Sequence, residues 1–484
     1  MSDPTPPPER PLAVWDGSCG FCRMSIERLR AELAGRVDDA PYQEVGERFA
    51  PLGPDDYARA VHLIEPDGRR SVGAEAVFRA LAYRDSGFPW LALYRHLPGF
   101  AALCEFGYRV VARQRAAVRK LAVALIGEDM RPLRHDWMRF LYLRALGAVA
   151  LCAALSLAAQ LDGLSGSTGI LPAREYLGLV ESSLAERDAS RWLEVPTLLW
   201  IDASDAAQHV LAASAIVLSL AVLLDLAPGP CLLALWAVYL SLCNGAGVFF
   251  AYQWDVLLLE TLLLSALFAP WRLLPRPPWR RAGPVDRAPP LASIWLLRLL
   301  LFKLLLLSGA VKLASGDPTW RSLTALDFHF FTQPLPTWTA YWMHQLPKPV
   351  LALACAAVLG LELGLPWLML APRRIRAIAC AGTLALMTAI GVTGNYGFFD
   401  PLTAVLAIAL LDDRMLPARL RGSAPEPRVQ PPGASRRAGA LALAALWCTL
   451  SGLAMLGALT GRVPGGDAAR ALVERSYAFH LASS

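Results

Sequence analysis

The stretch "WDGSCGFC", residues 15–22, places two cysteines three positions apart directly after an Asp-Gly turn. The preceding "PLAV" is a short apolar run typical of a strand, and "CRMSIERLRAEL" has the apolar spacing of an amphipathic helix. We therefore expect Cys19 at or just before a helix N-terminus, where unpaired backbone N–H groups and the helix dipole favour a thiolate. Cys22, one turn later, is placed to resolve a mixed disulfide formed at Cys19.

The residues downstream continue the same kind of domain. "AVHLIEPDGRRSVGAEAVFRAL", residues 60–81, predicts a strand, a Pro-Asp-Gly turn, a second strand and a helix. This is the order of the second half of a thioredoxin-like fold. In thioredoxin-like enzymes a cis-proline usually precedes the third strand and holds the substrate, but Arg59 and Ala60 stand there in this sequence.

Residues 11–120 resemble the DCC family of thiol-disulfide oxidoreductases, whose signature is Asp-Gly followed by CxxC. The signature reads "DGSCGFC" here, and "GAEAVFRAL" and "YRVVARQR" are also similar to that family. The resemblance implies thiol-disulfide exchange with Cys19 as attacker, Cys22 as resolver and Asp16 as a further catalytic residue. It implies no bound cofactor.

Two other interpretations of the cysteine pair stay open. The pair could be half of a zinc site, although no second CxxC is present and His62, His96 and Cys104 lack the tight spacing of metal ligands. The pair could also be inert. We expect no metal.

The remainder of the 484-residue chain is strongly apolar, which raises the hydrophobic content to 55%. A transmembrane helix needs roughly 20 apolar residues. We expect eight or nine such helices in an all-α polytopic domain. The stretches that meet or approach this length are residues 140–161, 208–227, 229–248, 252–271, 292–314, 350–371, 376–394, 398–415 and 438–460, of which 398–415 is the weakest.

The placement of Lys and Arg predicts the orientation of these spans, because cytoplasmic loops carry the excess of basic residues. With the N-terminus inside, the inner loops hold many Arg residues and the outer loops few. Nine crossings fit this alternation, whereas eight would put the basic loop from Arg414 to Arg437 outside. The basic residues of the inner loops are Arg272, Arg276, Arg280, Arg281, Arg287, Arg373, Arg374, Arg376, Arg414, Arg419, Arg421, Arg428, Arg436 and Arg437.

No signal peptide is visible in "MSDPTPPPERPLAVWDG". We therefore expect an integral protein of the bacterial inner (plasma) membrane with a cytoplasmic N-terminal domain, where thiols are kept reduced by a cytoplasmic thiol reductant. The net charge of +6 does not indicate nucleic-acid binding, since the basic residues fall between apolar spans. Seven basic residues before the first span suggest attraction to anionic lipid of the bilayer. They are Arg113, Arg115, Arg119, Lys120, Arg131, Arg134 and Arg139.

We expect the following organisation of the chain. A disordered N-terminus (1–10) precedes a DCC-like α/β domain of thioredoxin-like fold (11–125) and a basic juxtamembrane segment (126–139). A transmembrane domain (140–415) follows, and then a Pro-rich cytoplasmic linker (416–437), a final transmembrane helix and a short extracytoplasmic tail (438–484).

Several polar segments of the membrane half resemble the lipase maturation factor family, in order from about residue 140 to 415. They are "STGILPAREYL" (167–177), "PTLLWIDASD" (196–205), "YQWDVLLLETLLL" (252–264), "SGDPTWRSLTALDFHFFTQPLPTWTAYWMHQLP" (315–347) and "GNYGFFDPLTAVLAIALLDD" (394–413). The resemblance implies a polytopic protein that assists the folding of secreted lipases, with the long loop on the far side of the membrane. The domain is more distantly similar to the membrane domain of vitamin K-dependent carboxylases.

The loop at 315–347 is the candidate surface for a client or substrate, because an ordered loop rich in polar and aromatic residues commonly carries function. We favour structural roles for its two histidines over a metal or acid-base role, since they do not share a close spacing. The candidate residues are Asp317, Trp320, Arg321, Asp327, His329, Gln333, Trp338 and His344.

Ionisable residues within apolar spans are costly and are usually paired or functional. We expect interhelical ion pairs, with Glu260 or Glu362 against Lys303 or Arg298. An internal polar site is the other interpretation. The residues concerned are Asp255, Glu260, Arg298, Lys303, Lys312 and Glu362.

The other cysteines do not favour an electron relay across the membrane. The outer loops hold none, and Cys243 lies near the outer end of its span without a nearby partner. The remaining five cysteines of the membrane half lie singly within apolar spans, where small buried packing residues are expected. They are Cys152, Cys231, Cys355, Cys380 and Cys448.

The preferred hypothesis is a membrane-anchored thiol-disulfide oxidoreductase whose membrane domain assists the folding or maturation of a client, such as a secreted lipase. One alternative is a non-enzymatic membrane chaperone or assembly factor with a dispensable dithiol. Another is an enzyme that modifies a lipid or quinone within the membrane.

Overall fold

The structure is a computed structural model that describes residues 7–33, 35–45, 48, 54–84, 90–250, 252–279, 287–417 and 430–482. The chain divides into two compact units. The first unit is built mainly from residues up to Arg134, and the second from residues His135 onward. Most of the expected disordered N-terminus (1–6) and most of the expected Pro-rich linker (418–429) lie outside the described residues. The same holds for Arg280, Arg281, Arg419, Arg421 and Arg428 of the predicted inner loops.

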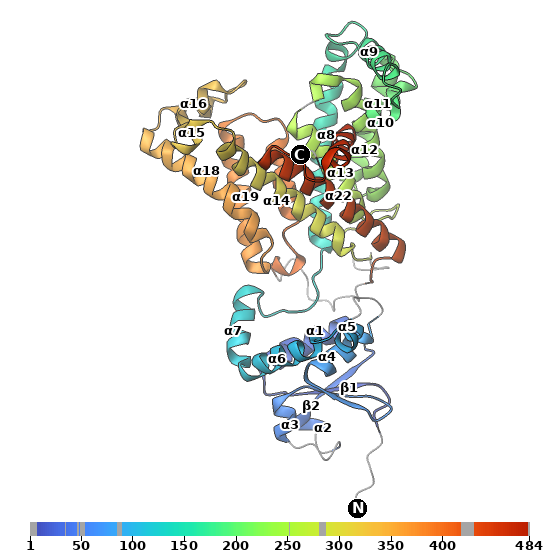
Figure 1. The fold of residues 1–484 in the computed structure, drawn as a ribbon, viewed down its shortest axis with the longest axis vertical. Helices are drawn as coiled ribbons and strands as arrows, with labels where there is room; N and C mark the ends of the chain where they lie inside the picture. Colours follow the sequence, from blue (N-terminus) through green and yellow to red (C-terminus); the bar gives the residue numbers. More distant parts are fainter. Residues whose placement is uncertain are drawn as a thin grey trace, which may run out of the picture. The chain divides into compact units, whose positions relative to one another are not determined.

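The first unit is an α/β domain with a four-stranded sheet in the order β2-β1-β3-β4 (Figure 1). Strand β1 (Leu12–Trp15) is parallel to β2 (Asp38–Pro41) and antiparallel to β3 (His62–Ile64), which is antiparallel to β4 (Arg70–Val72). Helix α1 (Gly20–Leu33) joins β1 to β2, and α4 (Gly73–Ala82) follows β4. The elements predicted on either side of the CxxC motif and in residues 60–81 are therefore present in the expected order.

Alternating residues of β1 pack into two hydrophobic clusters, one on each face of the sheet, because successive strand side chains point to opposite faces. Ala13 and Trp15 pack with Ile26 of α1 and with α4. Val14 packs on the other face against Tyr57 and Ile64. Both faces of the sheet are thereby covered, and the end of β1 that leads into the CxxC motif is held from both sides. The unit also holds α2 (Tyr42–Val45), α3 (Pro54–Arg59), α5 (Trp90–His96), α6 (Phe100–Arg113) and α7 (Arg115–Leu125).

The second unit is helical. Six of its helices are long and apolar enough to cross a membrane: α8 (Asp136–Leu164), α11 (Asp205–Leu223), α14 (Leu291–Ala314), α18 (Lys348–Met369), α19 (Arg373–Thr393) and α22 (Ala434–Thr460). The expected count of eight or nine spans is not confirmed. The other three predicted stretches form α12 (Pro228–Gly245), α13 (Gln253–Phe268) and α20 (Phe399–Ile408), which do not reach this length and apolarity within the described residues.

Two of these three stretches are largely buried within the helical unit. Most residues of α13 are buried in the core of the helical unit, and so are most residues of α20. A short apolar helix at the centre of a bundle has the hydropathy of a span, because its apolar side chains face other helices on all sides.

The described residues of the second unit also form shorter helices. They are α9 (Ala173–Ala185), α10 (Arg191–Glu194), α15 (Pro318–Arg321), α16 (Ala325–Thr332), α17 (Trp338–His344) and α23 (Gly466–Ala478), together with three 3-10 turns at Leu198–Trp200, Gly247–Phe250 and Asp413–Met415. The segment expected only as a short tail thus contains the helix α23.

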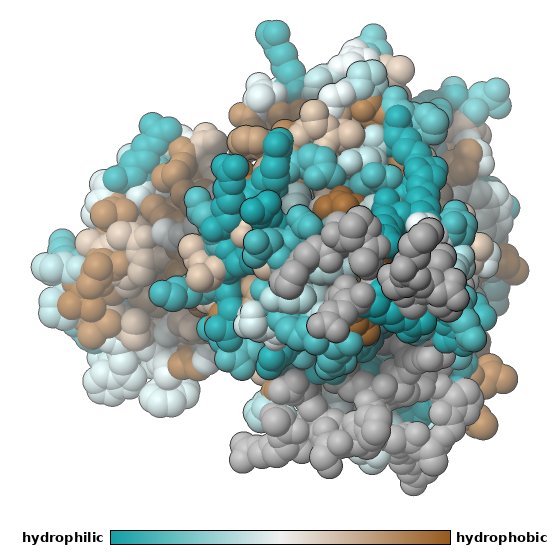
Figure 2. Space-filling model, turned by 90° about the horizontal axis from the view of Figure 1, so that it is seen from below, coloured by the Kyte–Doolittle hydropathy of each residue, from teal (hydrophilic) through white to brown (hydrophobic). Residues whose placement is uncertain are grey.

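Large apolar side chains remain exposed on the sides of the spanning helices, such as Val210 and Val217 of α11 and Leu353 of α18. Hydrophobic residues also gather at the left of Figure 2, the side on which Figure 1 draws α18. A protein surface in water rarely carries such patches, whereas lipid covers them without cost. The exposed apolar sides of these helices therefore face lipid.

Helices α8 and α11 pack closely against each other. A Cβ atom at Gly147 of α8 would lie 2.7 Å from the backbone N and 3.0 Å from the Cα of Leu223. Small residues at such crossings let two backbones approach, which is how membrane helices gain packing energy.

We expect Gly147→Val to destabilise the protein by about 1–3 kcal/mol, because the added methyl groups must push α8 away from α11. The thermal unfolding midpoint of the full chain in detergent measures this effect. Gly163→Val is the matched control, since a Cβ at Gly163 of the same helix meets nothing within 4 Å. Equal unfolding midpoints for the two variants would contradict the close packing.

Candidate functional site

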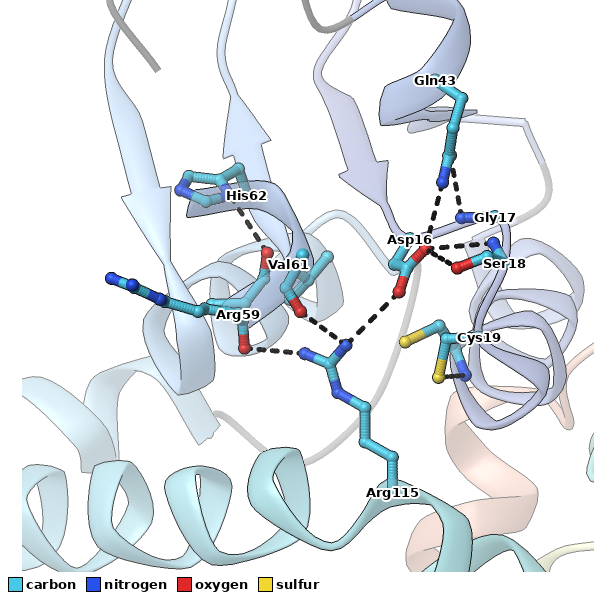
Figure 3. A network of polar contacts seen from close by, with 12 residues as sticks. Asp16, Gly17, Ser18, Cys19, Gln43, Arg59, Val61, His62 and Arg115 are labelled. Carbon is cyan, nitrogen blue, oxygen red and sulfur yellow. Dashed lines mark hydrogen bonds and ion pairs between the residues drawn. The ribbon is translucent and has the colours of Figure 1, made fainter. Parts of the chain in front are cut away.

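The turn between β1 and α1 is held by the carboxylate of Asp16 (Figure 3). Asp16 accepts hydrogen bonds from the backbone N–H of Ser18 (3.0 Å), the hydroxyl of Ser18 (2.7 Å) and the amide Nε2 of Gln43 (3.1 Å). Gln43 accepts in turn from the backbone N–H of Gly17 (3.1 Å). The Asp-Gly turn is therefore held by its own residues and by Gln43 of α2, and this sets the position of Cys19, two residues after Gly17.

The pKa of Asp16 is lowered. Burial alone raises it, but the hydrogen bonds from Ser18 and Gln43 and the positive charge of Arg115 outweigh the burial. Asp16 is consequently ionised at neutral pH, and its oxygens serve as acceptors that organise the turn.

Cys19 directly precedes α1, as the sequence predicts. Its sulfur accepts a hydrogen bond from the backbone N–H of Cys22 at 3.4 Å. This is the position of a helix N-cap, where a side-chain acceptor satisfies one of the free N–H groups of the first turn. The N–H group and the helix dipole both favour negative charge on the Cys19 sulfur.

Cys22 lies within the first turn of α1 and packs against the hydrophobic core around Trp15 and Ile26. Burial raises the pKa of Cys22 to about 12, with a further contribution from the hydrogen bond to Cys19, while the charge of Arg115 acts in the opposite direction. The two thiols thus have unequal surroundings, one at a helix terminus and one against the core. Both are free thiols.

Arg115, the first residue of α7, joins three parts of the site (Figure 3). It donates to the carbonyl oxygens of Ala58 (2.8 Å) and Arg59 (2.7 Å), and it lies 3.8 Å from Asp16. The sequence interpretation counted Arg115 among residues attracted to lipid, and this assignment missed its position beside the dithiol. The spacing of 57 residues between Ala58 and Arg115 leaves no local signal that could have revealed it.

The segment before β3 is held by side chains of two helices that come later in the chain, α6 and α7. Besides the contacts of Arg115, the N–H of Val61 donates to the hydroxyl of Tyr108 on α6 at 2.8 Å. His62, a candidate zinc ligand in the sequence, contacts the Ala60 carbonyl at 3.1 Å through Nδ1. Within the described residues, no group of three or more His, Cys, Asp or Glu side chains gathers that could hold a metal.

In the second unit, several predicted residues of the outer loop make local structural contacts. Asp317 caps α15 by accepting from the Thr319 N–H (2.9 Å) and hydroxyl (2.7 Å). Arg321 donates to the Leu313 carbonyl at 2.9 Å, and the ring of Trp320 lies 5.2 Å from the Lys312 ammonium. These contacts fix the first part of the loop to the end of α14.

The later loop residues contact different neighbours. His329 Nε2 lies 3.0 Å from the hydroxyl of Tyr396, and Gln333 donates to the Thr393 carbonyl at 3.0 Å. The His344 ring packs edge-on against Phe331. Asp327 is half-buried in the first turn of α16, and Trp338 is exposed at the start of α17. Each histidine thus has an aromatic neighbour of its own.

The intramembrane charges form interhelical pairs. Glu260 pairs with Lys303 at 3.3 Å, which is one of the expected pairs, whereas Glu362 pairs with Lys312 at 2.7 Å. Arg298 donates to the Ala409 carbonyl at 3.1 Å. Asp255 accepts from the hydroxyl of Tyr239 at 2.6 Å. The two ion pairs offset the cost of burying their charges, whereas Arg298 and Asp255 contact uncharged groups.

All nine cysteines of the chain are free. Cys355 and Cys380 are buried, as expected for packing residues. The expectation of burial is wrong for Cys152 and Cys448, which are exposed on the sides of α8 and α22. Hydropathy places a residue in a span but does not tell which side of the helix faces lipid.

Residues 137–418 match the family model of the lipase maturation factor transmembrane domain, which is more than half of the chain. The chain belongs to the lipase maturation factor family. Residues 13–121, which include Cys19, Cys22 and Arg115, match the family model of the DCC1-like thiol-disulfide oxidoreductases. The chain is therefore an integral membrane protein with transmembrane helices and a DCC-type domain, as the sequence resemblances predicted.

Relatives agree with this assignment. Lipase maturation factor 2 of Homo sapiens is 39% identical over 295 residues, which are 58% of this chain and 40% of the relative. Lipase maturation factor 2 of Gallus gallus is 41% identical over 285 residues, which are 57% of this chain and 38% of the relative. Lipase maturation factor 1 of Homo sapiens is 31% identical over 350 residues, 67% of this chain and 60% of the relative. The chain thus spans less than two thirds of the length of these lipase maturation factors. No solved structure matches the chain significantly.

We expect alkylation of the reduced full chain by iodoacetamide at pH 7.5 to modify Cys19 much faster than Cys22, because the thiolate reacts. With a pKa of about 12, fewer than about one in 10⁴ Cys22 thiols is ionised at this pH, and the fraction rises about tenfold per pH unit. Quantitative peptide mass spectrometry over pH 7–10 measures both rates.

Arg115→Met should slow the alkylation of Cys22 at each pH, since the variant removes the positive charge that lowers the pKa of this thiol. Arg113→Met, which changes an exposed arginine two residues earlier, is the control. Modification of Cys22 as fast as Cys19 at pH 7.5 would contradict the assigned surroundings of the two thiols.

Proposed function

We propose that this member of the lipase maturation factor family carries out thiol-disulfide exchange at Cys19 and Cys22 and assists the maturation of a client protein. The observation that carries the proposal is the pair of unequal thiols at the start of α1. The sulfur of Cys19 accepts a helix N–H, and Cys22 packs against the core. An attacking thiolate and a protected resolving thiol need these two environments.

The reaction has two steps. The Cys19 thiolate attacks one sulfur of a substrate disulfide, forms a mixed disulfide and releases the other sulfur as a thiolate. The Cys22 thiolate then attacks the Cys19 sulfur, so that a Cys19–Cys22 disulfide forms and the second substrate thiolate leaves. Two electrons pass to the substrate, and a thiol reductant must return the Cys19–Cys22 pair to the dithiol.

Asp16 and Arg115 act on this reaction through position and charge. Asp16 is ionised and bonded to Ser18 and Gln43, so it holds the turn that carries Cys19. The Arg115 charge opposes the burial that raises the pKa of Cys22 and thereby assists the second step, in which this thiol must lose its proton. Arg115 also holds the backbone before β3, where thioredoxin-like enzymes place a proline that binds substrate.

The membrane domain supports a role in maturation through its family. We propose a secreted lipase-like protein as the client and the loop at 315–347 as the part of the chain that engages it. We further propose that the DCC-type domain is thioredoxin-like and lies on the cytoplasmic side, because the predicted inner loops carry the excess of Arg. The relatives described above are vertebrate proteins, and a bacterial inner membrane stays a prediction from the sequence.

We expect Cys19→Ser to lower the disulfide reductase activity of the full chain by two orders of magnitude or more, as for loss of a catalytic nucleophile. The full chain in lipid nanodiscs is assayed with a fluorescent disulfide reporter and a thiol reductant. Cys22→Ser should retain the first attack and accumulate a mixed disulfide with the reporter on Cys19. Cys104→Ser, at a lone half-buried cysteine of α6, is the matched control. Unchanged activity in Cys19→Ser would contradict the proposal.

The family assignment also favours a second candidate, a membrane chaperone whose dithiol is dispensable. Co-expression with a secreted lipase distinguishes the two, with the activity of secreted lipase per amount of lipase protein as the measurement. Under the first proposal, Cys19→Ser/Cys22→Ser lowers lipase maturation. Under the second, this variant matures lipase normally while Arg321→Met, which breaks the contact of the loop with the end of α14, lowers it.

A further inference from the structure

An apolar face covers the two short helices of the outer loop, α16 (Ala325–Thr332) and α17 (Trp338–His344). Six large aromatic or apolar side chains of these helices and of the connection between them are 51% to 78% exposed. They form what we call the hairpin face: Phe328, Phe331, Leu335, Trp338, Tyr341 and Trp342. Six large apolar side chains exposed within two short helices and their connection indicate a partner, because water does not favour such a surface.

The opposite side of the hairpin is already packed. Ala325, Leu326 and Phe330 of α16 and Ala340 of α17 form a cluster with Leu351 and Cys355 of α18. The hairpin face is therefore a second apolar side of these helices, in addition to the side that packs against α18. Helices that are apolar on two sides need a second apolar environment.

Three hydroxyl groups of the hairpin make hydrogen bonds within the protein, so they do not depend on water at its surface. The hydroxyl of Thr337 accepts from the N–H of Ala340 (3.3 Å), and Thr339 donates to the Val392 carbonyl. Thr332 donates back to the Phe328 carbonyl at 3.1 Å. From Ala325 to Leu346 the only residue that carries a formal charge at neutral pH, with His counted as neutral, is the half-buried Asp327.

The hairpin also continues a lipid-facing surface. It packs on the first two turns of α18, and the neighbouring residues Val350 and Leu353 of those turns are exposed at 44% and 72%. Trp and Tyr side chains are enriched where a bilayer meets water, since their rings are apolar and their N–H and O–H groups are polar. The hairpin face contains two Trp and one Tyr, the residue types that are enriched in this zone.

We propose that the α16–α17 hairpin lies in the interfacial zone of the bilayer, with the hairpin face against lipid. Its partner is thus the apolar and glycerol region of the lipids around α18, and not a client protein. The hairpin anchors the loop at 315–347 to the membrane and leaves the segment from Asp317 to Thr324 as its water-facing part.

Cysteine accessibility tests the position of the hairpin. Tyr341→Cys and Phe331→Cys are made in the full chain, which is reconstituted in nanodiscs of phosphatidylcholine and phosphatidylglycerol. A charged, membrane-impermeant maleimide is added, and peptide mass spectrometry quantifies labelling at each site separately, so the nine natural cysteines can stay. Ser322→Cys and Gln345→Cys, at exposed polar positions of the same loop, are the controls.

We expect labelling at both hairpin positions to be slower than at the controls by at least about tenfold, which corresponds to a rise of one unit in thiol pKa in apolar surroundings. The two hairpin residues are exposed and lie outside the packed cluster, so their replacement should leave the fold intact, and an unchanged thermal midpoint verifies this. Labelling of both positions as fast as Ser322→Cys and Gln345→Cys would overturn the proposal. That result would leave the hairpin face open to water and available to a client.

Discussion

The arrangement of the membrane unit depends on one buried carboxylate, Glu260 of α13. No part of Glu260 is exposed, and a single oxygen, Oε1, receives Lys303 of α14 (3.3 Å), the indole N–H of Trp447 of α22 (2.6 Å) and the backbone N–H of Ala482 (2.9 Å). An unpaired charge in this position would destabilise the unit by several kcal/mol. The need to pair it therefore fixes which sides of three helices face one another and brings the segment after α23 into the bundle.

The same constraint explains the other buried charges of the helical unit. Asp225 pairs with Arg144 (3.1 Å) and Arg272 (2.7 Å), and Asp412 pairs with Arg376 (3.3 Å). Each pair joins parts of the chain that are distant in sequence, so the pairs select one packing among several that hydropathy alone would allow. These paired residues of the helical unit thus have a structural explanation.

The sequence predicts those features that depend on neighbouring residues. The strand, Asp-Gly turn and helix around Cys19 follow from local patterns, and the structure contains them. The roles of Arg115 and Tyr108 could not be predicted, because each reaches the segment before β3 across about fifty residues. Hydropathy alone does not fix the number of spans either, because the apolar residues of α13 are mostly buried among other helices. The positions of Arg115 and Tyr108 and the burial of α13 both depend on contacts between distant segments, and such contacts cannot be inferred from the local pattern of a single sequence.

The hairpin face and the part of the loop around α15 would meet different partners. If lipid covers the hairpin face, a client meets the loop mainly at α15 and the residues beside it. There Asp317 and Arg321 are exposed, and Arg321 is tied to the end of α14 through the Leu313 carbonyl. Lys312, one residue earlier on α14, holds the buried Glu362 of α18 and faces the ring of Trp320. A client that binds at α15 would therefore act on the contact between α14 and α18 through Trp320 and Lys312. This short chain of contacts connects the water-facing part of the loop to the packing of two spanning helices.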